Sequence, residues 1–219
     1  MVNKINCVIF DLDGTLLDTI EDITDAINLA YHKNGLASYS VKEVMYFVGS
    51  GVDLLVERSL RARKLSIDYF PSIKKEYLIA YQNCQKNKTK PYPGIVETLI
   101  HLKDKGIKLA VISNKPQIDT EKVIEYYFPQ GLFDLVVGAT KDTPLKPNPE
   151  VVFQTMTKLK VTNEETIYVG DSDIDMKTAT MAKLKSIGCT WGFRTLEELL
   201  KNNASYVVNT PEEIIKIIC

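Results

Sequence analysis

The sequence predicts an α/β fold, in which a doubly wound parallel sheet is joined by a smaller all-helical domain. Short apolar runs alternate with amphipathic segments of helix length over most of the chain, which is the pattern of a parallel sheet covered by helices. One region, from about residue 18 to residue 87, shows helical patterns without a convincing strand. The 219 residues exceed a usual single domain of about 100 to 150 residues, which leaves room for both parts.

Six short apolar runs are predicted to be the strands of the sheet. The first, Cys7–Phe10, is apolar throughout and stops at the polar turn Asp11–Gly14, which is typical of a strand buried on both faces. The other five are Leu109–Ile112, Leu135–Val137, Ile167–Val169, Ser186–Ile187 and Tyr206–Val208. Helices are predicted between them at residues 95–105, 117–127, 149–159 and 173–184.

The helical region reads as an insertion into this alternating pattern. Its helical patterns cover residues 20–31, 41–47, 52–61 and 73–85. The segment Lys88–Gly94 ends the region, because its two prolines and its glycine cannot continue a helix. We therefore place the catalytic core at residues 1–16 and 89–219, and the helical domain at residues 17–88.

Composition excludes several classes of protein. The 27 Lys and Arg residues are balanced by 28 Asp and Glu residues, so the chain lacks the positive excess that nucleic acid binding usually needs. No apolar stretch approaches the roughly 20 residues of a membrane span, and no signal-like segment precedes the first strand. We expect a cytoplasmic protein without nucleic acid or membrane partners. The four cysteines show no CxxC spacing, which predicts reduced thiols.

Reactive polar residues follow four of the predicted strands. They are Asp11 and Asp13, the segment Ser113–Lys115, Lys146 in the stretch after the third strand, and the segment Gly170–Asp175. Ligands of open parallel sheets bind beyond the carboxyl ends of the strands. Taken singly, these residues could be turn formers, helix caps or a solvated lysine. Their common placement at one edge of the sheet favours a functional site.

The acidic residues indicate a metal site and acid–base chemistry. Asp11 and Asp13 are two residues apart, so in an extended chain they project to the same side, roughly 6.5 to 7 Å apart. One carboxylate could attack while the other donates a proton. If Asp11 and Asp13 lie close to Asp171 and Asp175, their negative charges repel one another unless a cation is bound. Ligands that are all oxygen atoms favour a hard ion such as Mg²⁺. Lys146 and the hydroxyl of Ser113 could hold an anion with several oxygens, most simply a phosphoryl group.

These motifs resemble those of the haloacid-dehalogenase-like (HAD) superfamily of phosphotransferases. Asp11–Leu16 is similar to its first motif, Ser113–Lys115 to its second, Lys146 with Pro147 to its third, and Gly170–Met176 to its fourth. The resemblance covers nearly the whole chain and implies a Rossmann-type core. It also implies that the helical insertion is a mobile cap.

Within that superfamily the sequence is most similar to phosphoglycolate phosphatases. The similarity rests on Val48–Gly51 followed by Leu55–Leu60, on Tyr92–Gly94 and on Ser113–Pro116. Ser59, where alanine is common, and the stretch Thr140–Pro144 depart from the pattern. These departures concern the substrate and leave the expected chemistry intact.

The resemblance implies roles for the residues of the first motif. Asp11 would be the nucleophile that becomes an aspartyl phosphate. Asp13 would protonate the leaving alkoxide and then activate water. Gly14 would let the chain turn close to the phosphate.

The resemblance also implies the binding groups. Mg²⁺ would be held by Asp11, by the backbone carbonyl of Asp13 and by Asp171, with Asp175 either a ligand or an orienting group. Ser113, the Asn114 amide and Lys146 would bind the phosphoryl oxygens.

Three residues of the cap are predicted to recognise the part of the substrate distal to the phosphate. Gly49 and Gly51 precede a predicted helix, whose free amides attract anions. Arg58 could assist them. The alternative is that the glycines only shape a turn and Arg58 only pairs with a nearby acid.

The predicted function is therefore Mg²⁺-dependent hydrolysis of a small phosphate ester, most simply phosphoglycolate. A phosphosugar mutase or a pyrophosphatase of the same superfamily is the alternative. A non-catalytic phospho-acceptor module is disfavoured, because it would need neither Asp13 nor a cap. The sequence predicts no oligomeric state.

Overall fold

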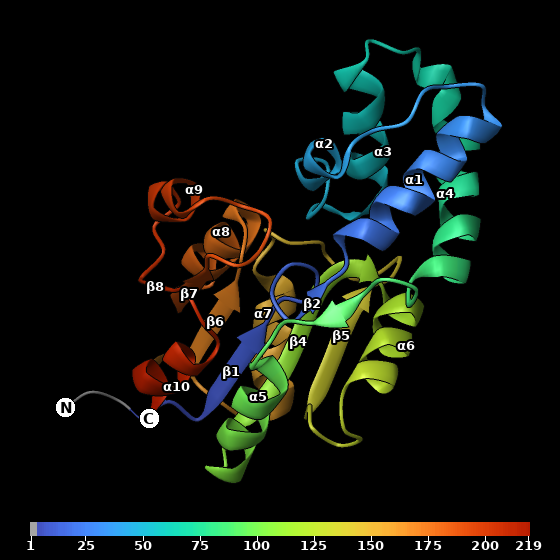
Figure 1. Cartoon of the computed structure of the whole chain (residues 1–219). Helices are drawn as coiled ribbons and strands as arrows, with labels where there is room; N and C mark the ends of the chain where they lie inside the picture. The colour runs from blue at the N-terminus through green and yellow to red at the C-terminus, as the bar shows by residue number, and fades with distance from the viewer. Residues whose placement is uncertain (1–3) are drawn as a thin grey trace. The chain divides into compact units, whose positions relative to one another are not determined.

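The computed structural model describes residues 4–219, which form two compact units (Figure 1). Unit 1 consists of the segment up to Leu17 together with Pro91–Cys219, and unit 2 is Asp18–Lys90. The chain passes between them through β2 (Leu17–Asp18) and β3 (Lys90–Pro91), which pair with each other as a two-stranded sheet.

Unit 1 is built on a six-stranded sheet in the order β5-β4-β1-β6-β7-β8, with every neighbouring pair parallel. Its strands are β1 (Cys7–Phe10), β4 (Lys108–Pro116), β5 (Leu135–Ala139), β6 (Thr166–Gly170), β7 (Lys185–Cys189) and β8 (Tyr206–Val208). Each of the six predicted runs lies in one of these strands, and the predicted fold class is confirmed. The central position of β1, between β4 and β6, follows from its entirely apolar sequence, because only a strand covered on both faces buries every side chain.

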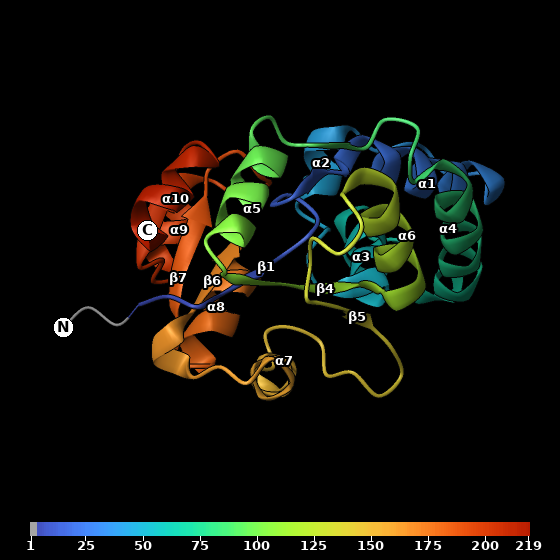
Figure 2. The same ribbon diagram turned by 90° about the horizontal axis from the view of Figure 1, so that it is seen from below.

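Helices cover both faces of this sheet (Figure 2). Val8 and Phe10 pack on one face with side chains of α5 (Ile95–Asp104), α6 (Gln117–Tyr127) and α10 (Glu212–Ile218). Cys7 and Ile9 pack on the other face with α7 (Glu150–Leu159) and α8 (Asp173–Met181). The alternation of side chains along β1 thus joins two separate apolar clusters into one core.

Two short helices are absent from the prediction, and several helix boundaries differ from it by one to three residues. The unpredicted helices are α9 (Leu196–Lys201) and α10, which are too short to show a clear helical period in the sequence. Helix α8 ends at Met181 and not at residue 184. Lys183 adopts a left-handed conformation with φ 57°, and the Leu184 amide donates to the Ala179 carbonyl, which closes the helix end. No glycine marks this end in the sequence.

The helices of unit 2 are α1 (Ile20–Lys33), α2 (Val41–Met45), α3 (Gly51–Ala62) and α4 (Phe70–Cys84), with a 3₁₀ turn at Ile67–Tyr69. Its interior contains hydrogen-bonded aromatic residues. Tyr31 donates to the Ser59 hydroxyl at 2.8 Å, and Tyr39 donates to the Ser59 carbonyl at 2.5 Å. Ser59, a departure from the family pattern, thus links α3 to α1 and to the segment before α2.

A buried carboxylate fixes the end of unit 2. Asp22, in the first turn of α1, accepts hydrogen bonds from the Lys88 amide and from both the amide and the hydroxyl of Thr89. Its side chain is fully buried. The returning segment is therefore tied to the first turn of the unit by one acidic side chain.

All four cysteines have free thiols. Within residues 4–219, none of the helices is both long and apolar enough to cross a membrane.

Replacing Asp22 should destabilise the protein. Asp22→Ala leaves three donors of Lys88 and Thr89 without their acceptor, which should lower the free energy of unfolding by at least about 2 kcal/mol. Asp25→Ala is the matched control, because Asp25 lies in the same helix and its side chain, 49% exposed, pairs with Lys88 only at the surface. That control should change the free energy by less than about 1 kcal/mol. Urea denaturation measures both values, and equal effects would contradict the assignment.

Candidate active site

The predicted polar residues of unit 1 come together at the carboxyl ends of the central strands. Asp11 follows β1 and Asp171 follows β6, while Asp175 lies in the first turn of α8. Ser113–Lys115 occupies the last part of β4, and Lys146 lies in the loop between β5 and α7. Because β4, β1 and β6 are neighbours in a parallel sheet, these ends meet at one edge.

Three buried carboxylates form the centre of the site. Oxygen atoms of Asp11, Asp171 and Asp175 lie within 4.8 Å of one another. The three residues are only 7%, 1% and 1% exposed. Burial and the neighbouring Asp175 carboxylate raise the pKa of Asp11 well above its ordinary value, and the same causes raise the pKa of Asp171 to about 7. A cation bound among these oxygens would relieve the repulsion, so the residues fit a divalent metal ion with oxygen ligands.

Lys146 supplies positive charge to this cluster. Its ammonium lies 2.5 Å from Asp11 Oδ1 and 2.8 Å from Asp175 Oδ1. Burial alone would lower the pKa of Lys146, but the two carboxylates outweigh burial and raise it well above its ordinary value. Lys146 is therefore a permanently charged group at the end of the sheet.

The side chain of Asn114 holds the backbone of Lys146. Asn114 Oδ1 accepts from the Lys146 amide at 2.8 Å, and Asn114 Nδ2 donates to the Lys146 carbonyl at 3.0 Å. The sequence interpretation assigned only the backbone amide of Asn114. The two side-chain bonds are an additional contribution, since they fix the Lys146 loop to β4. The Ser113 hydroxyl accepts from the Lys115 amide at 3.1 Å.

Asp175 is held from two directions. Its Oδ2 accepts from the amide and the hydroxyl of Ser172, at 3.1 and 2.6 Å, in a capping box that begins α8. Its Oδ1 accepts from Lys146. Both oxygens of Asp175 therefore already have hydrogen-bond donors.

Asp171 is held by a loop to which the sequence interpretation gave no role. The Phe193 amide donates to Asp171 Oδ2 at 2.6 Å, and the Thr15 hydroxyl donates to Oδ1 at 3.2 Å. The Trp191 indole in turn donates to the Thr15 carbonyl at 3.1 Å. The only sequence signal for this loop is its position directly after the strand β7.

Two glycines make room for Asp171. A Cβ on Gly192 would lie 2.2 Å from the Cβ of Asp171, and one on Gly14 would lie 2.4 Å from Asp171 Oδ2. Gly14 also has φ 96°, which favours glycine. The predicted close turn at Gly14 therefore serves the packing of Asp171 in this structure.

Asp13 lies apart from the carboxylate cluster and pairs with a second lysine. The Lys115 ammonium contacts Asp13 Oδ1 at 2.6 Å and Oδ2 at 2.8 Å. The two aspartates of the first motif thus have different cationic partners. Lys115 had been noted only as part of a motif, without a role of its own.

Gly49, Gly51 and Arg58 belong to unit 2. Both glycines have positive φ, 113° and 85°, and Gly51 begins α3. The Arg58 guanidinium donates to the Phe47 carbonyl at 3.1 Å and to the Ser50 hydroxyl at 2.8 Å. Within unit 2, Arg58 therefore braces the turn that contains the two glycines.

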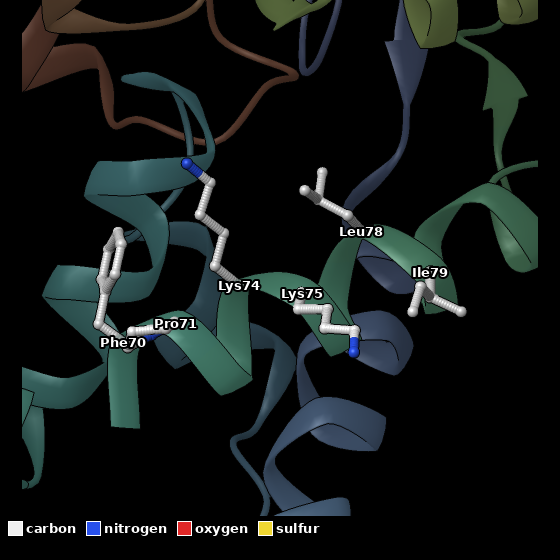
Figure 3. A pocket seen from close by; sticks show the side chains of 6 residues that line it. All are labelled: Phe70, Pro71, Lys74, Lys75, Leu78 and Ile79. Atoms are coloured by element: carbon white, nitrogen blue, oxygen red, sulfur yellow. The ribbon is translucent and has the colours of Figure 1, made fainter. Parts of the chain in front are cut away.

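A separate hollow in unit 2 lies along α4 (Figure 3). Its lining is mainly apolar and consists of Phe70, Pro71, Lys74, Lys75, Leu78 and Ile79. Lys74 pairs with Asp53 at 2.5 Å. This hollow contains none of the predicted site residues.

Comparison with known proteins places the chain in a family. The family model described as haloacid dehalogenase-like hydrolase matches residues 8–189. The chain belongs to the haloacid dehalogenase-like hydrolases. The predicted superfamily is confirmed.

Curated relatives of this hydrolase extend over nearly its whole length. A phosphoglycolate phosphatase of Aquifex aeolicus is 34% identical over 214 residues, which cover 96% of this chain and 95% of the relative. A phosphoglycolate phosphatase of Colwellia psychrerythraea is 29% identical over 95% of this chain and 94% of the relative. The crystal structure of a predicted phosphoglycolate phosphatase from Haemophilus somnus has a TM-score of 0.92 at 27% identity and covers both chains completely. The prediction of a phosphoric monoester hydrolase is confirmed by this family and these relatives.

The carboxylate cluster predicts how a metal ion and pH together control stability. Because the pKa values of Asp11 and Asp171 are raised, the folded state without metal binds more protons than the unfolded chain between about pH 4 and about pH 7. The free energy of unfolding should therefore fall as pH rises through this range. A divalent cation replaces those protons. Added Mg²⁺ should therefore raise the Tm more at about pH 8 than at about pH 5.5.

Differential scanning calorimetry tests this, with NaCl of equal ionic strength as the control for screening. Asp171→Asn removes one carboxylate and should shrink the difference between the two pH values. A Mg²⁺ effect of equal size at both pH values would count against metal binding by these carboxylates.

Proposed function

We propose that the protein is a Mg²⁺-dependent phosphatase, which hydrolyses a small phosphate monoester through an aspartyl phosphate on Asp11. The observation that carries the proposal is the division of the two aspartates of the first motif. Asp11 faces Asp171, Asp175 and Lys146, while Asp13 faces Lys115. This division supports separate roles for the two carboxylates in the proposal, with Asp11 as the nucleophile beside the cation and Asp13 as the group that transfers protons.

The charges of the site support a single divalent ion. When all four carboxylates are ionised, before Asp13 takes up the proton that it later donates, four carboxylates and two ammonium groups leave two negative charges, which one Mg²⁺ would neutralise. The groups counted are Asp11, Asp13, Asp171, Asp175, Lys115 and Lys146. Asp11, the backbone carbonyl of Asp13 and Asp171 are the ligands in this proposal. Asp175 acts as an orienting group, because its Oδ2 is held in the capping box with Ser172 and its Oδ1 pairs with the Lys146 ammonium, whereas the hydrogen-bond donors of Asp171 in this structure are an amide and a hydroxyl without charge.

In the first half-reaction, a carboxylate oxygen of Asp11 forms a bond to phosphorus while the bond from phosphorus to the leaving oxygen breaks. Asp13 gives its proton to that oxygen. The Ser113 hydroxyl, the Asn114 amide and the Lys146 ammonium bind the remaining phosphoryl oxygens. Bound Mg²⁺ supplies positive charge that neutralises the carboxylates and the phosphoryl oxygens.

In the second half-reaction, water forms a bond to phosphorus and passes a proton to Asp13. The bond between Asp11 and phosphorus breaks, and phosphate leaves. Asp13 ends with the proton that it gave up in the first step, so the two half-reactions restore the enzyme. The same pair of aspartates thus serves both half-reactions.

We propose phosphoglycolate as the substrate and unit 2 as the cap that recognises it. The names of the relatives support this choice. The turn at Gly49 leads directly into α3, which begins at Gly51, so the amides at the start of this twelve-residue helix suit a carboxylate. Arg58 acts by holding the turn in shape, since its guanidinium binds Phe47 and Ser50.

A phosphosugar mutase and a pyrophosphatase are the alternative functions. A mutase would share Asp11, Asp13 and the metal ligands, but would exclude water while the intermediate phosphorylates a sugar. Release of free phosphate from monoesters without a bisphosphate primer distinguishes a phosphatase from a mutase. Pyrophosphate in the same substrate panel tests the other alternative.

Asp11→Asn should abolish turnover, because the amide is a far weaker nucleophile than the carboxylate. We expect phosphate release to fall at least about 10³-fold with the fold unchanged by circular dichroism. Asp173→Asn is the matched control, because Asp173 lies in the same acidic segment as Asp171 but pairs with Lys177 at the surface. Acid quench of the wild type with ³²P-labelled substrate should show label on the protein. A variant that retained more than a few per cent of the wild-type rate would exclude Asp11 as the nucleophile.

Substitutions in the cap turn should change selectivity. Gly49→Ala and Arg58→Ala should lower kcat/KM for phosphoglycolate relative to ethyl phosphate by about 10- to 100-fold, or about 1.4 to 2.7 kcal/mol, because a remote contact that favours the carboxylated ester is lost. Arg61→Ala, on the exposed side of α3, is the control and should leave the ratio unchanged. An unchanged ratio in both test variants would remove this turn from substrate recognition.

A further inference from the structure

Lys115 is a buried cation at the end of β4, beside the proposed active site. Its side chain is only 5% exposed, and that of Asp13 is 14% exposed. Its ammonium contacts both oxygens of Asp13, so the carboxylate is fixed at two points. A buried ammonium without a partner costs several kcal/mol, so a lysine buried at this position needs a carboxylate partner, and Asp13 provides it.

The arrangement keeps the two lysines of the site apart. Lys146 contacts Asp11 and Asp175, whereas Lys115 contacts Asp13. The strand β4 carries Lys115, and the Asp13 segment follows β1, the direct neighbour of β4 in the sheet. The position of the Asp13 carboxylate is therefore defined by the sheet through Lys115.

We propose that Lys115 is a positioning residue, which holds the Asp13 carboxyl group where both proton transfers of the reaction take place. The inference rests on the proposed function. In the first half-reaction Asp13 must lie at the leaving oxygen, and in the second it must lie at the attacking water. Both atoms occupy the same side of the phosphorus, opposite Asp11, so one fixed position serves both steps. Lys115 itself exchanges no proton.

The test compares two esters that depend differently on Asp13. Ethyl phosphate has a poor leaving group, which needs protonation, whereas p-nitrophenyl phosphate needs little. Lys115→Met, which keeps the length of the side chain and removes its charge, should lower kcat/KM for ethyl phosphate about 10²-fold more than for p-nitrophenyl phosphate. Lys115→Arg should recover part of the loss, because it keeps a cation that can bind both carboxylate oxygens. Lys122→Met, on the exposed surface of α6, is the control.

A second readout separates positioning from a merely structural role. With p-nitrophenyl phosphate, Lys115→Met should release nitrophenolate in a burst close to one equivalent per enzyme and then turn over slowly, because hydrolysis of the aspartyl phosphate still needs Asp13. A general loss of structure would reduce the burst itself. The double variant with Asp13→Asn should be no slower than Asp13→Asn alone, since Lys115 acts only through Asp13.

Three outcomes would overturn the inference. They are equal losses on both esters without a burst, a double variant whose losses multiply, and a Lys115→Met rate equal to that of the wild type. If Lys115→Met does not fold, Lys115→Gln is measured in the same way, because it removes the charge and keeps a hydrogen-bond donor. A wild type that releases phosphate from neither ester would instead overturn the proposed function, and the inference with it.

Discussion

Electrostatic repulsion among three buried aspartates is the constraint around which unit 1 is organised. Asp11, Asp171 and Asp175 lie within 4.8 Å at the end of a sheet whose interior is apolar. Such a cluster is tolerated only with positive charge beside it, and Lys146 provides part of that charge. The bonds from Asn114 to the Lys146 backbone and the capping box on Asp175 follow from the same requirement, because the lysine must stay in place for the cluster to exist.

The fold and the centre of the site could be predicted because both are encoded in short runs of residues that are neighbours in the sequence. An apolar run such as Cys7–Phe10 predicts a strand, and because every residue in it is apolar, it also predicts that the strand lies in the interior of the sheet. The polar residues that follow such runs must then meet, since the carboxyl ends of parallel strands share one edge. This reasoning is enough to bring Asp11, Asp171 and Lys146 together without any knowledge of three-dimensional contacts.

The remaining features depend on contacts between residues far apart in the chain. Nothing in the sequence around Lys115 indicates that it pairs with Asp13, 102 positions away. The Phe193 amide that holds Asp171 is a backbone group, so it has no signature in the sequence. The helix end at Lys183 was missed because a lysine, and not a glycine, takes the left-handed conformation there. The resemblance to a known superfamily supplied roles that the residue types alone left open.

The two glycines beside Asp171 have a consequence for how such an enzyme can change during evolution. Because Gly14 and Gly192 enclose Asp171 with bare backbone, a substitution at either position displaces the carboxylate itself. The turn at Gly49 in unit 2 is not enclosed in this way, since a Cβ at Gly49 would meet no atom within 4 Å and the restriction there is its positive φ. Substitutions of residues around this turn can therefore change the segment proposed to select substrates without displacing the carboxylates of the proposed centre, so new specificities can arise in this scaffold without new chemistry.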